Sequence, residues 1–276
     1  MLEIGKFNNL EVVREVDFGF YLSSDKGDIL IPRKYVPEGT KIGEILNVFI
    51  YTDSEDRLIA TTLDPIAVVG EFAAMKVKDV TNFGAFLDWG IEKDLLVPDN
   101  EQHRKLNVGQ TTVVRLCLDA RTERVIGVGK LSPFLNKDFS QLEEGQLVNL
   151  MVYDETDLGY MVLIENQYSG MLYYNEVFEP LFIGDERKGH IRKLRSDGKI
   201  DVRLNKAGVE GIDDSKTLIL TKLETSNGFL PFHDKSDSES IKEAFLMSKK
   251  VFKKAIGGLY KDGKIVILDD GIKLNN

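Results

Sequence analysis

The sequence predicts a mainly β, multidomain chain: three consecutive five-stranded barrels followed by a smaller helical domain. Three observations support this prediction. A glycine beside aromatic or large apolar residues recurs at Gly19, Gly84 and Gly159, each followed 24 or 25 residues later by a second glycine. Each copy consists of short alternating runs separated by turn residues, as in strands. Near residue 212 the hydrophobic pattern changes to the helical period. A fixed internal spacing indicates one small unit repeated along the chain.

The repeat sets the predicted domain boundaries. The second glycines are Gly43, Gly109 and Gly184, and 16 residues after each stands an apolar residue typical of a strand: Ile59, Val125 and Ile200. We therefore predict barrels over residues 1–65, 66–138 and 139–211, and a separate domain over residues 212–276.

The second copy shows the strands most clearly. They are expected at residues 74–80, 84–89, 94–97, 111–118 and 124–129, with Pro98 ending the third. Five short strands with a longer connection between the third and the fourth are typical of a small closed barrel. Gly84 stands in the second strand, where such a barrel bends sharply.

The last domain is expected to contain three helices and a hairpin. The first helix covers residues 213–223 and ends at Asn227-Gly228; the second starts from a capping box with Ser236 at the N-cap and Glu239 at N3. Ser248 caps a third helix over 249–261, whose lysines lie opposite its apolar arc. Strands at 264–268 and 272–274 then form a hairpin. This order is typical of a winged helix, in which the third helix usually contacts nucleic acid. The lysine face then suits phosphate contact; the alternative is a solubilising face or a surface that docks on protein.

Composition suggests a soluble cytoplasmic protein with an anionic partner. The chain has a formal net charge of −9 and one cysteine, Cys117, in an apolar run that favours a buried structural thiol. The N-terminus shows no secretion signal, and no apolar run is long enough to cross a membrane. Two segments are nevertheless basic: residues 187–206 carry a local charge of +6 and residues 241–264 one of +5. Such runs are either solvated faces or phosphate-binding surfaces.

The segment from Asn82 to Asp88, with Leu106 to Gln110, closely resembles the S1 RNA-binding domain of the OB superfamily. The resemblance implies that the aromatics around the glycine stack on bases, which fits the sequence-tolerant stacking of single strands. The alternative is that each aromatic fills the barrel core. The stacking candidates are Phe83 and Phe86 in the second copy, Phe18 and Tyr21 in the first, and Tyr173 in the third.

The family also carries an acidic and a basic residue around the turn before the fifth strand. Asp53 and Arg57 match them in the first copy, and Asp119 and Arg124 in the second. The copies also depart from the family. Proline stands at the usual histidine position in the first two copies, at Pro32 and Pro98. The third copy has Tyr173 there, Leu158 and Met161 in place of the stacking pair, and Arg195 and Lys199 in place of the acidic–basic pair.

Three S1-like barrels followed by a winged helix resemble the bacterial conserved virulence factor B (CvfB) family over the full chain. The resemblance implies an RNA-binding regulator acting after transcription, with no catalytic chemistry. The sequence itself shows no metal-ligand spacing, phosphate loop or nucleophile arrangement, so no enzyme, metal or cofactor is expected. The expected phosphate contacts are Arg124, Arg192, Lys193, Arg195, Lys199, Lys249, Lys250, Lys253 and Lys254.

Three functions remain open at this point. The leading one is binding of RNA, preferably single-stranded. The second is an interaction module that docks on the ribosome, RNA polymerase or a nuclease. The third is a transcription factor that binds duplex DNA through the winged helix, which would leave the three barrels without a role. No membrane partner is expected.

Overall fold

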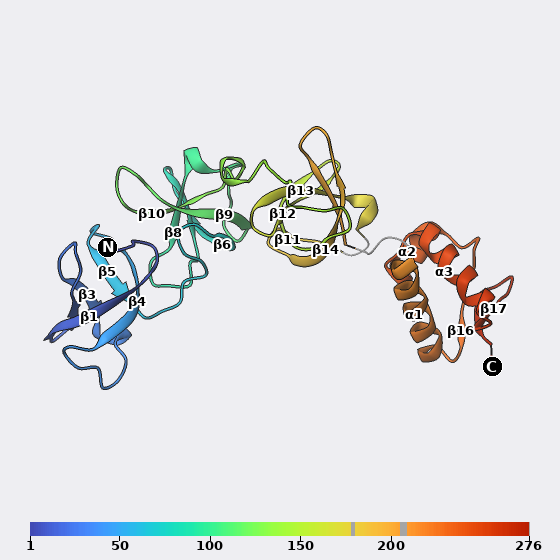
Figure 1. Ribbon diagram of the computed structural model, residues 1–276, viewed down its shortest axis with the longest axis horizontal. Helices are drawn as coiled ribbons and strands as arrows, with labels where there is room; N and C mark the ends of the chain where they lie inside the picture. Colours follow the sequence, from blue (N-terminus) through green and yellow to red (C-terminus); the bar gives the residue numbers. More distant parts are fainter. Residues whose placement is uncertain (178–179, 205–208, 276) are drawn as a thin grey trace. The chain divides into compact units, whose positions relative to one another are not determined.

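The computed structural model describes residues 1–177, 180–204 and 209–275 of the chain. It confirms the predicted fold: three closed barrels of five strands each, then three helices with a small sheet (Figure 1). The chain forms two compact units, residues 1–135 with the first two barrels and residues 136–276 with the third barrel and the helical domain. The domain boundaries predicted from the repeat stay predictions.

The first unit contains two barrels of the same topology. Barrel 1 consists of β1 (Phe7–Val16), β2 (Gly19–Leu22), β3 (Ile29–Pro32), β4 (Ile45–Thr52) and β5 (Leu58–Thr61). Barrel 2 consists of β6 (Phe72–Val80), β7 (Gly84–Leu87), β8 (Leu95–Pro98), β9 (Thr111–Leu118) and β10 (Val125–Val128). Short 3₁₀ turns follow the third strands, at η1 (Arg33–Tyr35) and η2 (Asp99–Glu101), and η3 (Ser132–Phe134) follows β10.

The second unit starts with barrel 3, made of β11 (Leu147–Thr156), β12 (Gly159–Ile164), β13 (Tyr168–Tyr173), β14 (Glu186–Leu194) and β15 (Ile200–Arg203), with η4 (Tyr174–Glu176) after β13. The third and fifth strands pair in parallel in all three barrels, which closes each sheet. The pairs are Leu30 with Ile59, Leu96 with Ile126, and Gly170 with Ile200.

The recurring glycine is required by the bend of the second strand. Gly19, Gly84 and Gly159 lie opposite Pro32, Pro98 and Tyr173 in the same register. At each of these glycines, a Cβ atom would overlap a backbone carbonyl oxygen of the third strand. Only glycine allows this close approach of two backbones. The first strand of each barrel also has a register shift at one matching place, which adds the curvature that closure needs.

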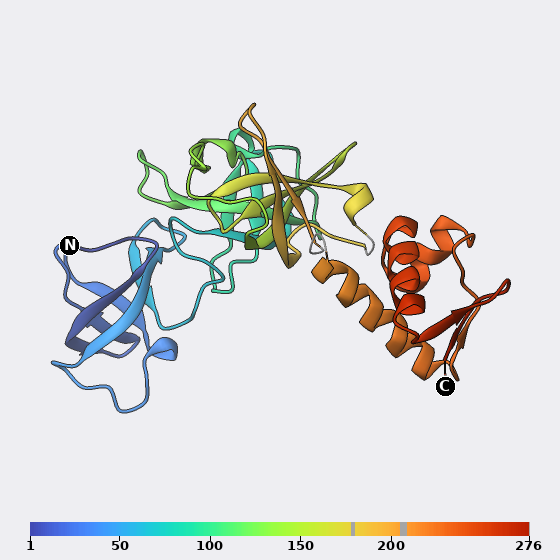
Figure 2. The same ribbon diagram turned by 45° about the vertical axis from the view of Figure 1, so that its right-hand side comes forward.

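The helical domain has the order α1 (Val209–Thr225), β16 (Phe229–Leu230), α2 (Ser238–Phe245), α3 (Lys249–Lys261), β17 (Ile265–Ile267) and β18 (Ile272–Leu274). Figure 2 shows α1 beside α3, with the small sheet at their end. Ser248 caps α3 as predicted, by accepting the Val251 N–H. This is the arrangement of a winged helix.

Two details of this domain correct the prediction. The N-cap of α2 is Asp237, not Ser236: its carboxylate accepts the N–H groups of Glu239 (2.9 Å) and Ser240 (3.0 Å). The Ser236 hydroxyl instead accepts the His233 N–H in the turn before the helix. The sequence pattern also predicts no strand between the first two helices, whereas β16 lies there and pairs with β18.

Barrels 1 and 2 share one hydrophobic core. Trp89, the single tryptophan of the chain, is 2% exposed and follows β7. Its ring makes an edge contact with Phe49 of β4, with 5.4 Å between the ring centroids, and its indole N–H donates to the Ala67 carbonyl at 2.8 Å. The contact between Trp89 and Phe49 therefore joins the two barrels. Separate cores fill barrel 3 and the winged helix.

We expect Phe49→Leu to lower the free energy of unfolding of the first unit by about 1–3 kcal/mol, because it removes the ring contact with Trp89 and leaves a cavity. Denaturant titration followed by Trp89 fluorescence measures this change directly. Phe245→Leu is the matched control, since Phe245 is 1% exposed but belongs to the winged-helix core. An equal shift in both variants would contradict the assignment.

Candidate nucleic-acid interface

The predicted stacking residues of barrel 2 form an exposed aromatic pair. Phe83 stands in the turn before β7 and is 55% exposed, while Phe86 is half-buried on β7. Their ring centroids are 5.8 Å apart and the ring planes are nearly perpendicular, at 89°. Phe86 alternates with buried Ala85 and Leu87, so the pair lies outside the barrel core. Core filling therefore does not account for Phe83.

Backbone hydrogen bonds hold Phe83 in this position. The Thr81 N–H donates to the Gly84 carbonyl at 2.8 Å and the Asp99 N–H to the Phe83 carbonyl at 3.1 Å. In barrel 1 the Arg33 N–H binds the Phe18 carbonyl in the same way, at 2.9 Å. A ring on a fixed turn loses little conformational entropy when it stacks on a ligand.

Barrel 1 presents its aromatics differently. Phe18 is 61% exposed, like Phe83. Tyr21 is half-buried, and the Arg14 guanidinium lies 4.2 Å from the centre of its ring. This cation–π contact covers part of the face that a base would need. Barrel 2 therefore offers the more accessible aromatic pair.

Beside Phe83 and Phe86 lies a groove of about 320 Å³ between barrels 1 and 2. Most of its lining is apolar, and its charged lining residues are two cations, Lys93 and Arg124, and two acids, Asp56 and Asp94. The remaining lining residues are Tyr51, Thr52, Ser54, Trp89, Leu96, Val125 and Ile126. An apolar site with a few charged groups suits a nucleobase attached to a phosphate.

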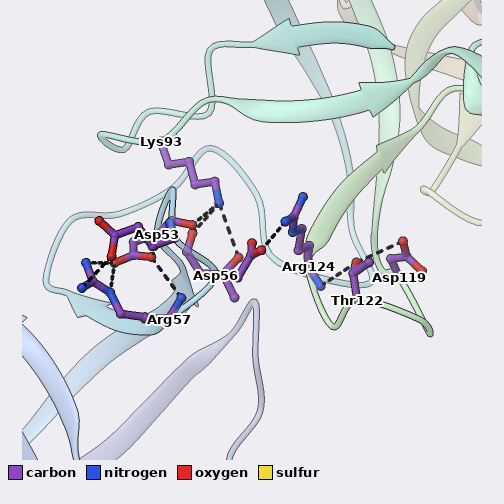
Figure 3. A network of polar contacts seen from close by, with 9 residues as sticks. Asp53, Asp56, Arg57, Lys93, Asp119, Thr122 and Arg124 are labelled. Carbon is purple, nitrogen blue, oxygen red and sulfur yellow. Dashed lines mark hydrogen bonds and ion pairs between the residues drawn. The ribbon is translucent and has the colours of Figure 1, made fainter.

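Both cations of the groove bind groups of barrel 1 (Figure 3). The Lys93 ammonium donates to the carbonyls of Thr52 at 2.7 Å and Asp53 at 2.8 Å. Burial, reinforced by the nearby charge of Arg124, lowers the pKa of Lys93. The Arg124 guanidinium forms an ion pair with Asp56. Asp119, the acidic residue that matches the family position near Arg124, accepts the Arg121 N–H and the Thr122 hydroxyl.

Asp53 organises the loop that holds Lys93. Its carboxylate accepts the N–H groups of Glu55 (2.9 Å) and Arg57 (3.0 Å) and the Arg57 side-chain Nε (2.9 Å). Burial raises the pKa of Asp53, but the hydrogen bonds from Arg57 and Glu55 outweigh it and lower the pKa overall. The predicted pair of Asp53 and Arg57 is present in the structure.

In barrel 3, several side chains of the basic segment 187–206 are paired with carboxylates. Arg195 contacts Asp197 at 2.8 Å and the Tyr173 hydroxyl at 3.4 Å, and Tyr173 donates to Asp201 at 3.3 Å. Two of the predicted contacts, Tyr173 and Arg195, therefore belong to one cluster. Arg192 binds Glu176 at 3.1 Å and Lys199 lies 4.0 Å from Asp197, while Lys193 is exposed. Lys206, also in the predicted basic run, lies outside the described residues.

The winged helix carries a more accessible basic face. On α3, Lys250, Lys253 and Lys254 are exposed, and Lys261 continues the face at the end of the helix. Lys253 has a long contact with Asp234, at 3.8 Å, and half-buried Lys249 donates to the Lys235 carbonyl at 3.4 Å. Lys250, Lys253 and Lys254 are therefore available for phosphate groups.

The sequence reasoning missed Lys93 and Asp56. Both lie in loops between strands, outside the glycine–aromatic repeat. They line the same groove only because barrels 1 and 2 pack against each other. Trp89 was expected at the end of a strand, with no role in this packing. The one tryptophan of the chain, which follows the repeat of the second copy, is a signal in the sequence that could have suggested such a junction.

The residues that the structure describes give no positive sign of a metal site or an activated cysteine. Among the side chains that the structure describes, no group of three or more His, Cys, Asp or Glu could hold a metal ion. Cys117 is half-buried, and burial raises the pKa of its thiol, which disfavours the nucleophilic thiolate. No helix in the described part of the chain is long and apolar enough to span a membrane.

Comparison with known proteins identifies the domains. The S1 domain family matches residues 4–63 and 69–126, and the CvfB-like winged helix domain matches residues 217–274. The protein YitL of Bacillus subtilis (strain 168) is 28% identical over 268 residues, which cover 95% of this chain and 90% of YitL. Conserved virulence factor B of Staphylococcus haemolyticus (strain JCSC1435) is 26% identical over 278 residues, which cover 97% of this chain and 93% of that protein.

A crystal structure of a multidomain protein with nucleic acid binding domains from Streptococcus pneumoniae TIGR4 is 25% identical, covers 98% of each chain and has a TM-score of 0.49. The S1 matches indicate nucleic-acid binding, and S1 and winged-helix domains are typically non-catalytic.

We expect Asp53→Asn to destabilise the first unit by about 1 kcal/mol at pH 7, because it weakens the hydrogen bonds that order the β4–β5 loop. Since the folded protein lowers the pKa of Asp53, this stabilisation is present above the unfolded pKa of about 3.9 and is lost as the pH falls through the folded pKa. The difference from the native chain, measured by Trp89 fluorescence, should shrink below about pH 4.

Glu55→Gln is the control for this variant. Glu55 also contacts Arg57, at 2.9 Å, but is 68% exposed, so its loss should change the unfolding midpoint little. A difference for Asp53→Asn that stays constant from pH 7 to pH 3 would contradict the assigned role of its carboxylate.

Proposed function

We propose that this chain, which belongs to the conserved virulence factor B family, binds single-stranded RNA and regulates gene expression after transcription in the bacterial cytoplasm, without catalysis of its own. The observation that carries the proposal is the exposed pair of Phe83 and Phe86 beside the apolar groove of barrel 2. The pair supplies base contacts, and the lysines of α3 supply phosphate contacts.

Stacking on the aromatic pair favours single strands. In a duplex the base faces are covered by neighbouring bases, whereas an unpaired base offers its face to a ring. Phe83 stands on a turn fixed by the Thr81 and Asp99 hydrogen bonds and needs no rearrangement to receive a base. Leu96 and Ile126 extend the apolar surface beside the pair. This surface offers few hydrogen-bonding groups, so weak sequence preference is expected.

The phosphate contacts are assigned mainly to α3. Lysine is a point charge that attracts phosphate without reading bases, which suits a protein that stacks bases elsewhere. Lys250, Lys253 and Lys254 are exposed on one helix. In barrel 3, Arg192, Arg195 and Lys199 already contact carboxylates, so they would have to exchange partners to bind RNA. We therefore rank the winged helix above barrel 3.

Phe83→Ala should weaken the binding of a fluorescent oligouridylate of about 12 nucleotides by about 5- to 150-fold, because one stacked base contributes about 1–3 kcal/mol. Phe86→Ala should act in the same direction. Fluorescence anisotropy at low salt measures both dissociation constants.

The control for this pair is Phe182→Ala in barrel 3. Phe182 is 69% exposed, but it lies in the connection between β13 and β14 and not at a repeat aromatic position. Its loss should leave the affinity within about twofold, a margin much smaller than one stacking contribution. Equal losses in all three variants would argue against a specific aromatic site.

Reversing the three exposed α3 lysines, with Lys250→Glu, Lys253→Glu and Lys254→Glu combined, should reduce affinity more than tenfold and flatten the salt dependence. Each phosphate contact on a single strand adds about 0.7 to the slope of log K against log salt, so three lost contacts reduce that slope by about 2. Titrations at several salt concentrations give the slope.

A pair of single variants controls for the change in charge. Lys254→Glu and Lys273→Glu make the same charge change in the same domain, but Lys273 lies on β18 rather than on α3. Only the first should flatten the slope. If the triple variant keeps the native slope, α3 is not a phosphate surface, and a role of the winged helix in protein contact is supported instead.

A further inference from the structure

The loop between β4 and β5 of barrel 1 forms part of the groove of barrel 2. This loop, residues 53–57, is called here the acidic loop, because it holds Asp53, Glu55 and Asp56 against one basic residue, Arg57. Ser54 and Asp56 line the groove together with Phe83 and Phe86. The acidic loop therefore borders the same groove as the aromatic pair on which a base would stack.

The acidic loop and the strand end before it bind both cations of the groove. Arg124 is paired with the Asp56 carboxylate, and Lys93 is held by the backbone carbonyls of Thr52 and Asp53 (Figure 3). A carboxylate beside a guanidinium occupies the same donors that would bind a phosphate oxygen. Beside the best aromatic pair, one cation is thus paired with a carboxylate of the neighbouring barrel, and the other is bound by its backbone carbonyls.

The geometry of the acidic loop favours this pairing. Asp53 fixes the turn by accepting two backbone N–H groups and the Arg57 side chain. Asp56 adopts the left-handed conformation, with φ of 64°, which aspartate tolerates better than most residues. The turn presents the Asp56 carboxylate to Arg124. Both partners keep substantial exposure, 43% for Arg124 and 48% for Asp56, so the pair can exchange with a ligand from solvent.

Contacts outside the acidic loop also join barrels 1 and 2. Lys34 binds Glu92 at 2.8 Å and Lys26 binds Glu123 at 2.8 Å, each joining barrel 1 to barrel 2. None of these four residues lines the groove. Trp89, which also lines the groove, packs against Phe49 and so joins the two barrels. The junction is thus held independently of the pair between Asp56 and Arg124, which leaves this pair free to act in binding.

We propose that the acidic loop of barrel 1 is an intramolecular competitor of RNA: Asp56 occupies Arg124 as a phosphate mimic, and RNA gains the full charge of the barrel 2 groove only by displacing it. The proposal rests on the proposed function, that this groove binds RNA. It adds that barrel 1 attenuates the affinity of barrel 2, and that Arg124 contacts phosphate only after the Asp56 carboxylate releases it.

Asp56→Asn tests the competition, with binding of the same oligouridylate measured by anisotropy over a range of salt. Freeing Arg124 adds one phosphate contact, so the slope of log K against log salt should steepen by about 0.7, which corresponds to about fivefold tighter binding at 0.1 M salt. The added substitution Arg124→Gln should abolish this gain, because the gain acts through that guanidinium.

Glu123→Gln is the matched control. It also removes one carboxylate from an ion pair between the barrels, and it changes the net charge equally, but its partner Lys26 lies outside the groove. Its affinity should stay within twofold of the native chain, less than the fivefold that one phosphate contact supplies. Equal tightening in both variants would reduce the effect to overall charge and overturn the proposal, as would weaker binding by Asp56→Asn. The Trp89 fluorescence transition verifies that the variants remain folded.

Oligonucleotide binding by the native chain and by Asp56→Asn distinguishes loss of the competition from loss of RNA binding itself. If the native chain binds through Phe83 and Asp56→Asn binds with the same affinity and slope, only the competition is overturned. If neither the native chain nor Asp56→Asn binds the oligonucleotide, both fall. If Asp56→Asn binds measurably where the native chain does not, the competition is supported in its strongest form.

Discussion

The packing of Trp89 between barrels 1 and 2 is the constraint on which the first unit depends. A barrel of about 65 residues has a small core, and burial of apolar surface in so small a domain gives limited stability. Trp89 extends one core across two barrels: its ring meets Phe49, and its N–H satisfies the Ala67 carbonyl. Because the barrels are joined in this way, loops of barrel 1 meet loops of barrel 2 at fixed positions. The groove, with both of its cations bound by groups of barrel 1, is a consequence of that junction.

The repeat predicted the fold well because each of its features has a local physical cause. Gly19, Gly84 and Gly159 are glycines because the third strand leaves no room for a Cβ atom. The same backbone requirement in three places produces the same spacing, so the topology followed from the sequence. The N-cap of α2 was misplaced by one residue because Ser236 and Asp237 are both good caps, and only the structure shows that the Ser236 hydroxyl is already bound by the His233 N–H.

The site could be predicted only where it depends on a single copy. Phe83 lies at a turn whose hydrogen bonds are formed within barrel 2, and its exposure follows from local geometry. Arg124 matches a family position and is therefore predicted as a site residue, but its partner is Asp56, 68 residues away in another barrel. Nothing in the repeat indicates Lys93 as a site residue. Pairings between repeats leave no periodic signal, because each barrel's strand pattern is complete without them.

The distribution of charge explains how an acidic protein can suit a polyanion. With a net charge of −9, the chain attracts RNA only where cations lie apart from its own carboxylates. In barrels 2 and 3, Arg124, Arg192 and Arg195 contact acidic side chains, which offset part of the positive charge of those surfaces. On α3, Lys250, Lys253 and Lys254 are exposed, and Lys253 has only a long contact with Asp234. Base stacking and phosphate attraction are therefore assigned to different domains. If stacking and phosphate contact are divided in this way, loss of the aromatic pair weakens RNA binding at every salt concentration. Loss of the lysines weakens it most at low salt, because only the phosphate contacts release counterions.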